Sequence, residues 1–185
     1  MPQVRKLVRD GIYALVSNPT SGFNERYAEA KQFYPAAEDV VIDWSPGIPG
    51  QAVQTIAKNF FIGELDENEL EQSGLQKFPA VCLFTEEADD TASDRRQKFM
   101  KFSGLVTAGL NWYVKHRDGI EQDNVEDTVS CIEDALLEVI NGDSSIWPSG
   151  VVYNGDYKSG KPHVRLIGNG YVTVLPCQLT FEVHV

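Results

Sequence analysis

The sequence is poor in cysteine and in basic residues. Three cysteines occur in 185 residues, at Cys82, Cys131 and Cys177, and none belongs to a CxxC pair. An odd number of widely spaced thiols argues against a disulfide-linked secreted domain, so we expect a reducing compartment. Lysine and arginine total 16 against 27 acidic residues, which gives a formal net charge of -11. Such a surface repels nucleic acid and anionic membranes and argues against general DNA binding.

Long apolar runs are also missing. No window approaches 18 uncharged apolar residues, and the first segment, MPQVRKLVRDGIYALVS, carries charges among its apolar positions. The sequence therefore predicts neither a signal peptide nor a membrane span, and we expect a soluble product of the cytoplasm. Hydrophobic residues make up 42% of the chain, enough for one good core at this length.

Signatures of catalysis and cofactor binding are weak or absent. GxSxG and HExxH do not occur, and the three histidines share no metal-ligand spacing. Gly155 to Lys161 fits the GxxxxGK pattern of a phosphate-binding loop, but Pro162 stands where a hydroxyl must meet magnesium. A strand rather than a helix is predicted to follow, so this segment reads as a hairpin tip. We expect no catalytic residue, no metal site and no cofactor.

The sequence contains two acidic runs. Glu64 to Glu71 and Glu86 to Asp94 are rich in carboxylates, which suit calcium and magnesium, yet neither run matches an EF-hand loop. Runs of like charge are usually solvated, so both are predicted to be exposed acidic loops.

The first half of the chain alternates helical and strand patterns. Apolar residues from Val4 to Val16 recur at helical spacing and predict an amphipathic helix that ends before Asn18. A second, short helix is expected to begin near Phe23. The β-branched run Val40 to Trp44 predicts a strand. The apolar part of Gln51 to Gln76 is ambiguous between helix and strand.

The second half is richer in strands. Pro79 to Phe84 predicts a strand buried on both faces, and Phe102 to His116 a long strand with one buried face. Asp123 is the expected N-cap of a helix that Asn141 and Gly142 terminate. Four short β runs follow, at 151–153, 161–167, 171–175 and 177–185. We expect an α+β fold in a single domain, an antiparallel or mixed β-sheet flanked by an N-terminal helix and a C-proximal helix.

Four of these segments carry a resemblance to a known family, in pattern more than in motif: Pro79 to Phe84, Phe102 to Arg117, Val125 to Asn141 and Gly170 to Val185. Their order resembles that of the tail terminators of long-tailed bacteriophages and, more broadly, of the tail-completion proteins at the head-tail joint. The stretches 63–76 and 147–162 look like insertions in such a domain.

The resemblance implies a structural virion protein, assembled in the host cytoplasm, that caps the tail tube as a ring, usually a hexamer. Its neighbours would be the tail tube protein and a head-completion or connector protein, with DNA passing through unbound and no membrane involved. Three alternatives stay open: another neck or tail-tube protein, a small α+β module that binds a ligand or peptide, and an enzyme that holds a metal in the acidic loops.

Charged residues supply the candidate sites of such a ring. A negative bore would keep the phosphate backbone from adhering, because like charges repel. The candidates for the bore are Glu86, Glu87, Asp89, Asp90 and Asp94, or else the Glu64 to Glu71 run. The densest basic patch, in the first helix, is the candidate contact with a neighbouring subunit and comprises Arg5, Lys6 and Arg9.

Overall fold

The computed structural model describes residues 2–47, 54–63, 78–90, 102–116, 121–142, 147–167 and 170–185. Its helices are α1 (Pro2–Val16), α2 (Phe23–Ala30), the 3-10 helix η1 (Lys31–Phe33) and α4 (Gln122–Gly142). Its strands are β1 (Gln54–Ala57), β2 (Phe60–Ile62), β3 (Ala80–Asp90), β4 (Ser103–Lys115), β5 (Val151–Ser159), β6 (His163–Ile167) and β7 (Gly170–His184).

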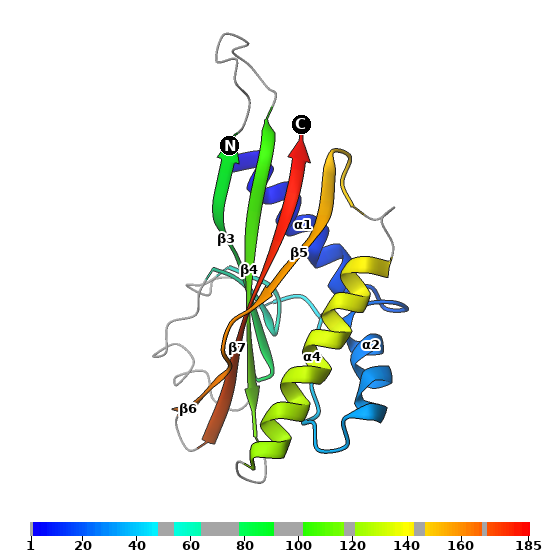
Figure 1. The fold of residues 1–185 in the computed structure, drawn as a ribbon, viewed down its shortest axis with the longest axis vertical. Helices are drawn as coiled ribbons and strands as arrows, with labels where there is room; N and C mark the ends of the chain where they lie inside the picture. Colours follow the sequence, from blue (N-terminus) through cyan, green and yellow to red (C-terminus); the bar gives the residue numbers. More distant parts are fainter. Residues whose placement is uncertain are drawn as a thin grey trace.

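The strands form one mixed sheet with the helices on one side of it (Figure 1). The order is β1-β2-β3-β4-β7-β5, and β6 pairs with the remaining part of the β7 edge. All neighbours are antiparallel except β2 and β3, which are parallel. The predicted α+β fold with an N-terminal helix and a C-proximal helix is confirmed.

The main core lies between the sheet and the helices α1 and α4. Val8 and Ile12 from α1, Trp112 from β4, and Ile132 and Leu136 from α4 all belong to one cluster of buried side chains. Burying a large apolar side chain contributes roughly 1.5 to 3 kcal/mol, so this cluster dominates the stability of the fold. Both predicted helical stripes therefore face the sheet, and α1 is packed as deeply as α4.

Close approach explains the glycine within α1. A Cβ atom at Gly11 would lie 2.9 Å from both the Trp147 ring and the Pro148 side chain. The segment that leads into β5 thus packs directly on the α1 backbone. Gly11 lowers helix propensity, but it lets these two parts of the chain meet.

The predicted long strand is confirmed, although it buries more than one face. The even positions of β4 from Gly104 to Val114 all face the main core. At its lower end Tyr113 also contributes to a second, smaller cluster on the opposite face, with Phe61, Cys82 and Val172. Among the described residues, the sheet therefore has buried side chains on both faces near this end.

The predicted strand at Val40 to Trp44 is wrong, because side chains take the place of a partner strand. The Asn24 side chain donates to the Ile42 carbonyl and accepts from the Ile42 N–H, both at 2.9 Å. Asp127 and Thr128 of α4 accept from the backbone N–H groups of Ala36 and Glu38, each at 2.9 Å. With these backbone groups satisfied, the segment stays extended without joining a sheet.

The prediction of a loop from Thr85 to Asp94 is also wrong over its first part. The β3 backbone continues to Asp90 and pairs with β4 as far as Gly104. Pairing with a long neighbouring strand overrides the low strand propensity of consecutive carboxylates. The stretch from 91 onward lies outside the described residues.

The C-terminal strands differ from the prediction in their continuity. The runs 171–175 and 177–185 form one strand, β7, that passes through Pro176. Proline is tolerated at position 176 because it lies between the part of β7 that pairs with β5 and the part that pairs with β6, where its missing N–H is not needed for pairing. The Pro176 carbonyl still accepts a hydrogen bond from Gly160 N–H at 2.8 Å. Gly155 to Lys161 is consequently no hairpin tip, since β5 and β6 lie end to end along β7.

Smaller differences concern α4 and the expected insertions. The helix begins at Gln122, so Asp123 lies in its first turn rather than at the N-cap, where it still complements the helix dipole. Asn141 and Gly142 are its last residues. Of the stretch 63–76 only Gly63 is described, while 147–162 contains all of β5 and packs Trp147 against Phe181 at a ring-centroid distance of 4.9 Å. That either stretch is an insertion stays a prediction.

Candidate interaction surfaces

The acidic strand end is the first candidate surface. Glu86 is exposed in β3, and its Oε2 accepts a hydrogen bond from Gln178 Nε2 at 2.6 Å. The backbones of Glu87, Asp89 and Asp90 pair with Thr107, Leu105 and Gly104 of β4. Four of the five predicted bore residues therefore follow one another on a single strand. Asp94 and the Glu64 to Glu71 run lie outside the described residues.

The same end of the sheet carries an exposed hydrogen-bonded group. Ser103 Oγ lies 2.9 Å from His184 Nδ1, and His184 Nε2 lies 2.8 Å from Glu182 Oε1. A hydroxyl, an imidazole and a carboxylate in this order are the groups of a hydrolase triad. Here about half of each of the His184 and Glu182 side chains is exposed, on the open face of the sheet. The arrangement ties β4 to the end of β7.

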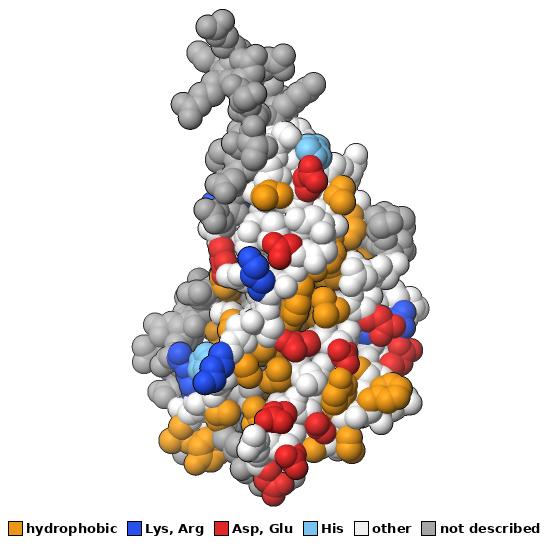
Figure 2. Space-filling model, in the orientation of Figure 1, with side chains coloured by type: hydrophobic (Ala, Val, Ile, Leu, Met, Phe, Trp, Pro, Cys, Tyr) orange, Lys and Arg blue, Asp and Glu red, His pale blue; other side chains and the backbone are white. Residues whose placement is uncertain are grey.

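The open face of the sheet is mostly polar with isolated apolar residues. Leu105, Glu182 and Val152 lie in register across β4, β7 and β5, with Leu105 42% and Val152 54% exposed. Figure 2 shows acidic side chains spread over most of the visible face. One group of lysine, arginine and histidine side chains lies at its lower left, where Figure 1 places β6, and other basic side chains lie near the middle, at the right edge and near the top.

The strand β6 is the second candidate surface. In the part of the chain that the structure describes, β6 pairs with β7 alone, so its other edge is a template for further pairing. Leu166 lies opposite Tyr171 and beside Val164 on one face, and these side chains are 65%, 48% and 38% exposed. Neighbouring apolar side chains on an open edge are typical of a protein contact.

The basic face of α1 is the third. Arg5 and Lys6 are exposed, and Arg9, one turn beyond Arg5, is partly buried with its Nε 3.9 Å from Asp10 Oδ1. The structure brings the three predicted interface residues together on one helix. It does not bring them to Glu86, because α1 packs on the face of the sheet opposite to the Glu86 side chain.

One buried polar group, centred on His116, was not predicted from the sequence. His116 is 3% exposed and lies between two partners, with its Nε2 2.5 Å from Thr173 Oγ1 and its Nδ1 3.2 Å from Glu38 Oε1. Thr173 is 1% exposed, so no substrate reaches its hydroxyl in this conformation. The group links β4, β7 and the extended segment after η1, which points to a structural role. Only the position of His116 on the buried face of β4 hinted at it.

All three cysteines are buried. Burial raises the pKa of the Cys177 thiol to about 12, and burial likewise raises that of Cys131 to about 11. Thiols of such high pKa are protonated at neutral pH and make poor nucleophiles and poor metal ligands. Tyr34 is a further group with a raised pKa, about 12, because its hydroxyl donates to Asp134.

Neither a metal cluster nor a membrane helix is found within the ranges that the structure covers. No three or more His, Cys, Asp or Glu side chains described there form a group that could hold a metal ion. None of the helices described there combines the length and the apolar character needed to cross a membrane.

Comparison with known proteins adds no further assignment, since neither a protein-family model nor a curated protein sequence matches this chain.

Proposed function

We propose that this protein is a structural component of a phage virion, a tail terminator that assembles as a ring, most simply of six copies. In this role it caps the finished tail tube and offers a docking surface to a head-completion or connector protein. The proposal starts from the resemblance in element order: an N-terminal helix, a Phe-Pro-Ala-Val strand, a long alternating strand, a helix and a terminal strand.

The observation that carries the proposal is the open edge strand β6. Four of its five residues are exposed, and its apolar side chains Val164 and Leu166 are left in solvent beside Tyr171. A chain that stays monomeric gains nothing from such an edge, because an open strand with exposed apolar residues promotes association. Contact with another chain buries these apolar side chains and pairs the open edge.

The acidic strand end supports the passage of DNA through the ring. Glu86 is exposed, and the backbones of Glu87, Asp89 and Asp90 continue the same strand beyond it. If this end lines the bore, the phosphate backbone meets like charge and slides without binding. The alternative role of these carboxylates is to keep the assembly soluble.

Sedimentation velocity of the purified chain at tens of micromolar tests the proposal against its rivals. A species of about six chains favours the terminator. A monomer that takes up a divalent metal tightly favours an enzyme, and a monomer that binds neither metal nor tail tubes favours a ligand-binding module. Because a terminator ring can require the tube as a template, the run is repeated with tail tubes added.

A further inference from the structure

Charge is distributed unevenly between the segment around β6 and the helix α4. The chain has no acidic residue from Tyr157 to Phe181, a stretch that contains Lys158, Lys161 and Arg165. In contrast, α4 contains six acidic residues and neither lysine nor arginine. A protein with a net charge of -11 that has no acidic residue in this stretch, and neither lysine nor arginine in a long helix, has two segments of opposite sign.

The first surface, here called the basic flank, is built on β6. Its charged and polar members, Lys161, His163 and Arg165, are all exposed. Its apolar members are Val164, Leu166 and Tyr171, of which Leu166 is 65% exposed. Because successive side chains of a strand point to opposite faces, Val164 and Leu166 lie on one face of β6 and His163 and Arg165 on the other. The basic flank therefore presents apolar and positive side chains on the two sides of one open strand edge.

The second surface, the acidic flank, is built on α4 and η1. Asp123, Glu126 and Asp134 of α4 are exposed. Phe33 of η1 lies near Asp134 and at 80% has the highest exposed fraction among the large hydrophobic residues that the structure describes. The two elements are joined because the hydroxyl of Tyr34, the residue after Phe33, donates to Asp134. The acidic flank thus has an aromatic side chain and a negative rim.

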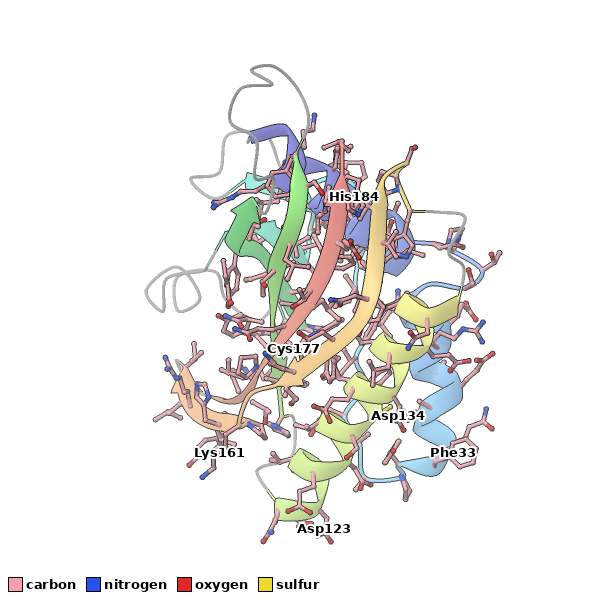
Figure 3. The ribbon with its side chains drawn as sticks, turned by 45° about the horizontal axis from the view of Figure 1, so that its top comes forward. Phe33, Asp123, Asp134, Lys161, Cys177 and His184 are labelled. Carbon is pink, nitrogen blue, oxygen red and sulfur yellow. The ribbon has the colours of Figure 1, made fainter. Side chains whose placement is uncertain are left out.

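Lys161 of the basic flank and Phe33 of the acidic flank lie on opposite sides of the molecule, with Asp123 between them in the view of Figure 3. Figure 3 shows Lys161 at one side, beyond β5 and β6, and Phe33 at the other, beyond α4 and α2. Asp134 lies between them on the surface of α4, nearer to Phe33. Two different complementary surfaces on one molecule favour a head-to-tail contact between copies, which closes into a ring when the rotation permits.

We propose that the basic flank of one copy docks on the acidic flank of the next, with Phe33 of the second copy packing against Leu166 and Tyr171 of the first. This inference names the subunit contact and rests on the proposed ring. Opposite charges set the orientation of the two copies and speed their encounter, while burial of the apolar side chains stabilises the contact. Duplex DNA is the other partner that a basic strand suits, and it is an outcome of the test.

Two charge-reversed variants provide the test. Variant A carries Lys161→Glu and Arg165→Glu, and variant B carries Asp123→Lys and Glu126→Lys. Each variant places like charges in every contact between its own copies and is expected to associate roughly tenfold more weakly than wild type. A mixture of A and B restores opposite charges at both kinds of contact, so alternating rings are expected to form again.

Matched controls separate the contact from general effects of charge. Asp156→Lys with Glu182→Lys makes the same charge change as variant B on the open sheet face and is expected to leave assembly unchanged. Leu166→Ser and Phe33→Ser are expected to weaken assembly, whereas Val152→Ser, at a residue 54% exposed on β5, is expected not to. Circular dichroism confirms that each variant is folded before its assembly is measured.

The outcomes distinguish failure of this subunit contact from failure of the proposed ring. Recovery of assembly in the mixture of A and B supports the contact. If wild type, A and B all form the same rings, the inference is overturned while the ring stands. If wild type remains a monomer with and without tail tubes, both fail. If A loses binding to duplex DNA but assembles normally, the basic flank belongs to nucleic acid and the inference is again overturned.

Discussion

His116 Nε2 lies 2.5 Å from Thr173 Oγ1, a contact that joins the end of β4 to β7 inside the protein. The other ring nitrogen faces Glu38, so one side chain ties two strands to the extended segment after η1. Neither the hydroxyl nor the imidazole reaches solvent. The stability of the segment that leads away from α2 therefore depends on a residue far from it in sequence.

The first prediction is that His116→Ala destabilises the fold. Removing the imidazole leaves the buried hydroxyl of Thr173 and the partly buried carboxylate of Glu38 without this partner, which costs about 1 to 3 kcal/mol. Urea denaturation measures the change in the free energy of unfolding. His184→Ala is the matched control, because His184 is exposed and is expected to cost little. Equal stability of the two variants would contradict a structural role for His116.

The second prediction concerns the thiols. Cys82, Cys131 and Cys177 are buried, and the raised pKa values of Cys131 and Cys177, about 11 and about 12, keep both thiols protonated at pH 8. We expect a disulfide reagent such as DTNB to detect no fast-reacting thiol in the native protein and all three in guanidinium chloride. A thiol that reacts within seconds under native conditions would show that the core opens at that position.

The third prediction concerns the basic face of α1. Reversing Arg5 and Arg9 to glutamate is expected to leave the fold intact, because Arg5 is exposed and Arg9 is only partly buried, on a helix whose core-facing side chains include Val4, Val8 and Ile12. Ring formation or tail completion should weaken, and more so as salt is lowered and repulsion between acidic surfaces grows. Equal assembly of wild type and variant across a salt series would mark these residues as an ordinary solvated helix face.

The fourth prediction concerns the acidic strand end. Glu86→Lys combined with Glu87→Lys is expected to leave rings that retain DNA at low salt, because the phosphate backbone then meets positive charge. Retention should fall steeply as salt rises. Asp156→Lys, on another strand, is the control and should retain less DNA. A ring structure with these carboxylates on its outer rim and a bore lined by lysine and arginine would refute the assignment.

Periodic segments were the predictable part of the fold. In α4 the stripe through Val129, Ile132 and Leu136 is buried as its helical spacing predicts, and the even positions of β4 face the core as their alternation predicts. Both patterns arise because one face of the element is buried and the other is exposed, and this periodicity is visible in the sequence alone.

Features that depend on distant partners were not predictable. Ile42 sits in a β-branched run, yet its backbone hydrogen bonds go to the side chain of Asn24 in a different element. Glu87 sits in a run typical of a loop, yet pairing with Thr107 of β4 makes it part of a strand. The hydrogen bond of His116 to Thr173 spans 57 positions of sequence. The β6 surface is an intermediate case, because the absence of acidic residues from 157 to 181 is visible in the sequence while the exposed edge is not.

Electron microscopy of the purified protein, alone and mixed with tail tubes, tests the central claim most directly. Six chains of 20.6 kDa each should form a ring with a central opening, either free in solution or seated at one end of a tube. A field of single compact particles of one chain each, with bare tube ends in the mixture, would contradict the assignment of this protein as a ring that terminates a tail.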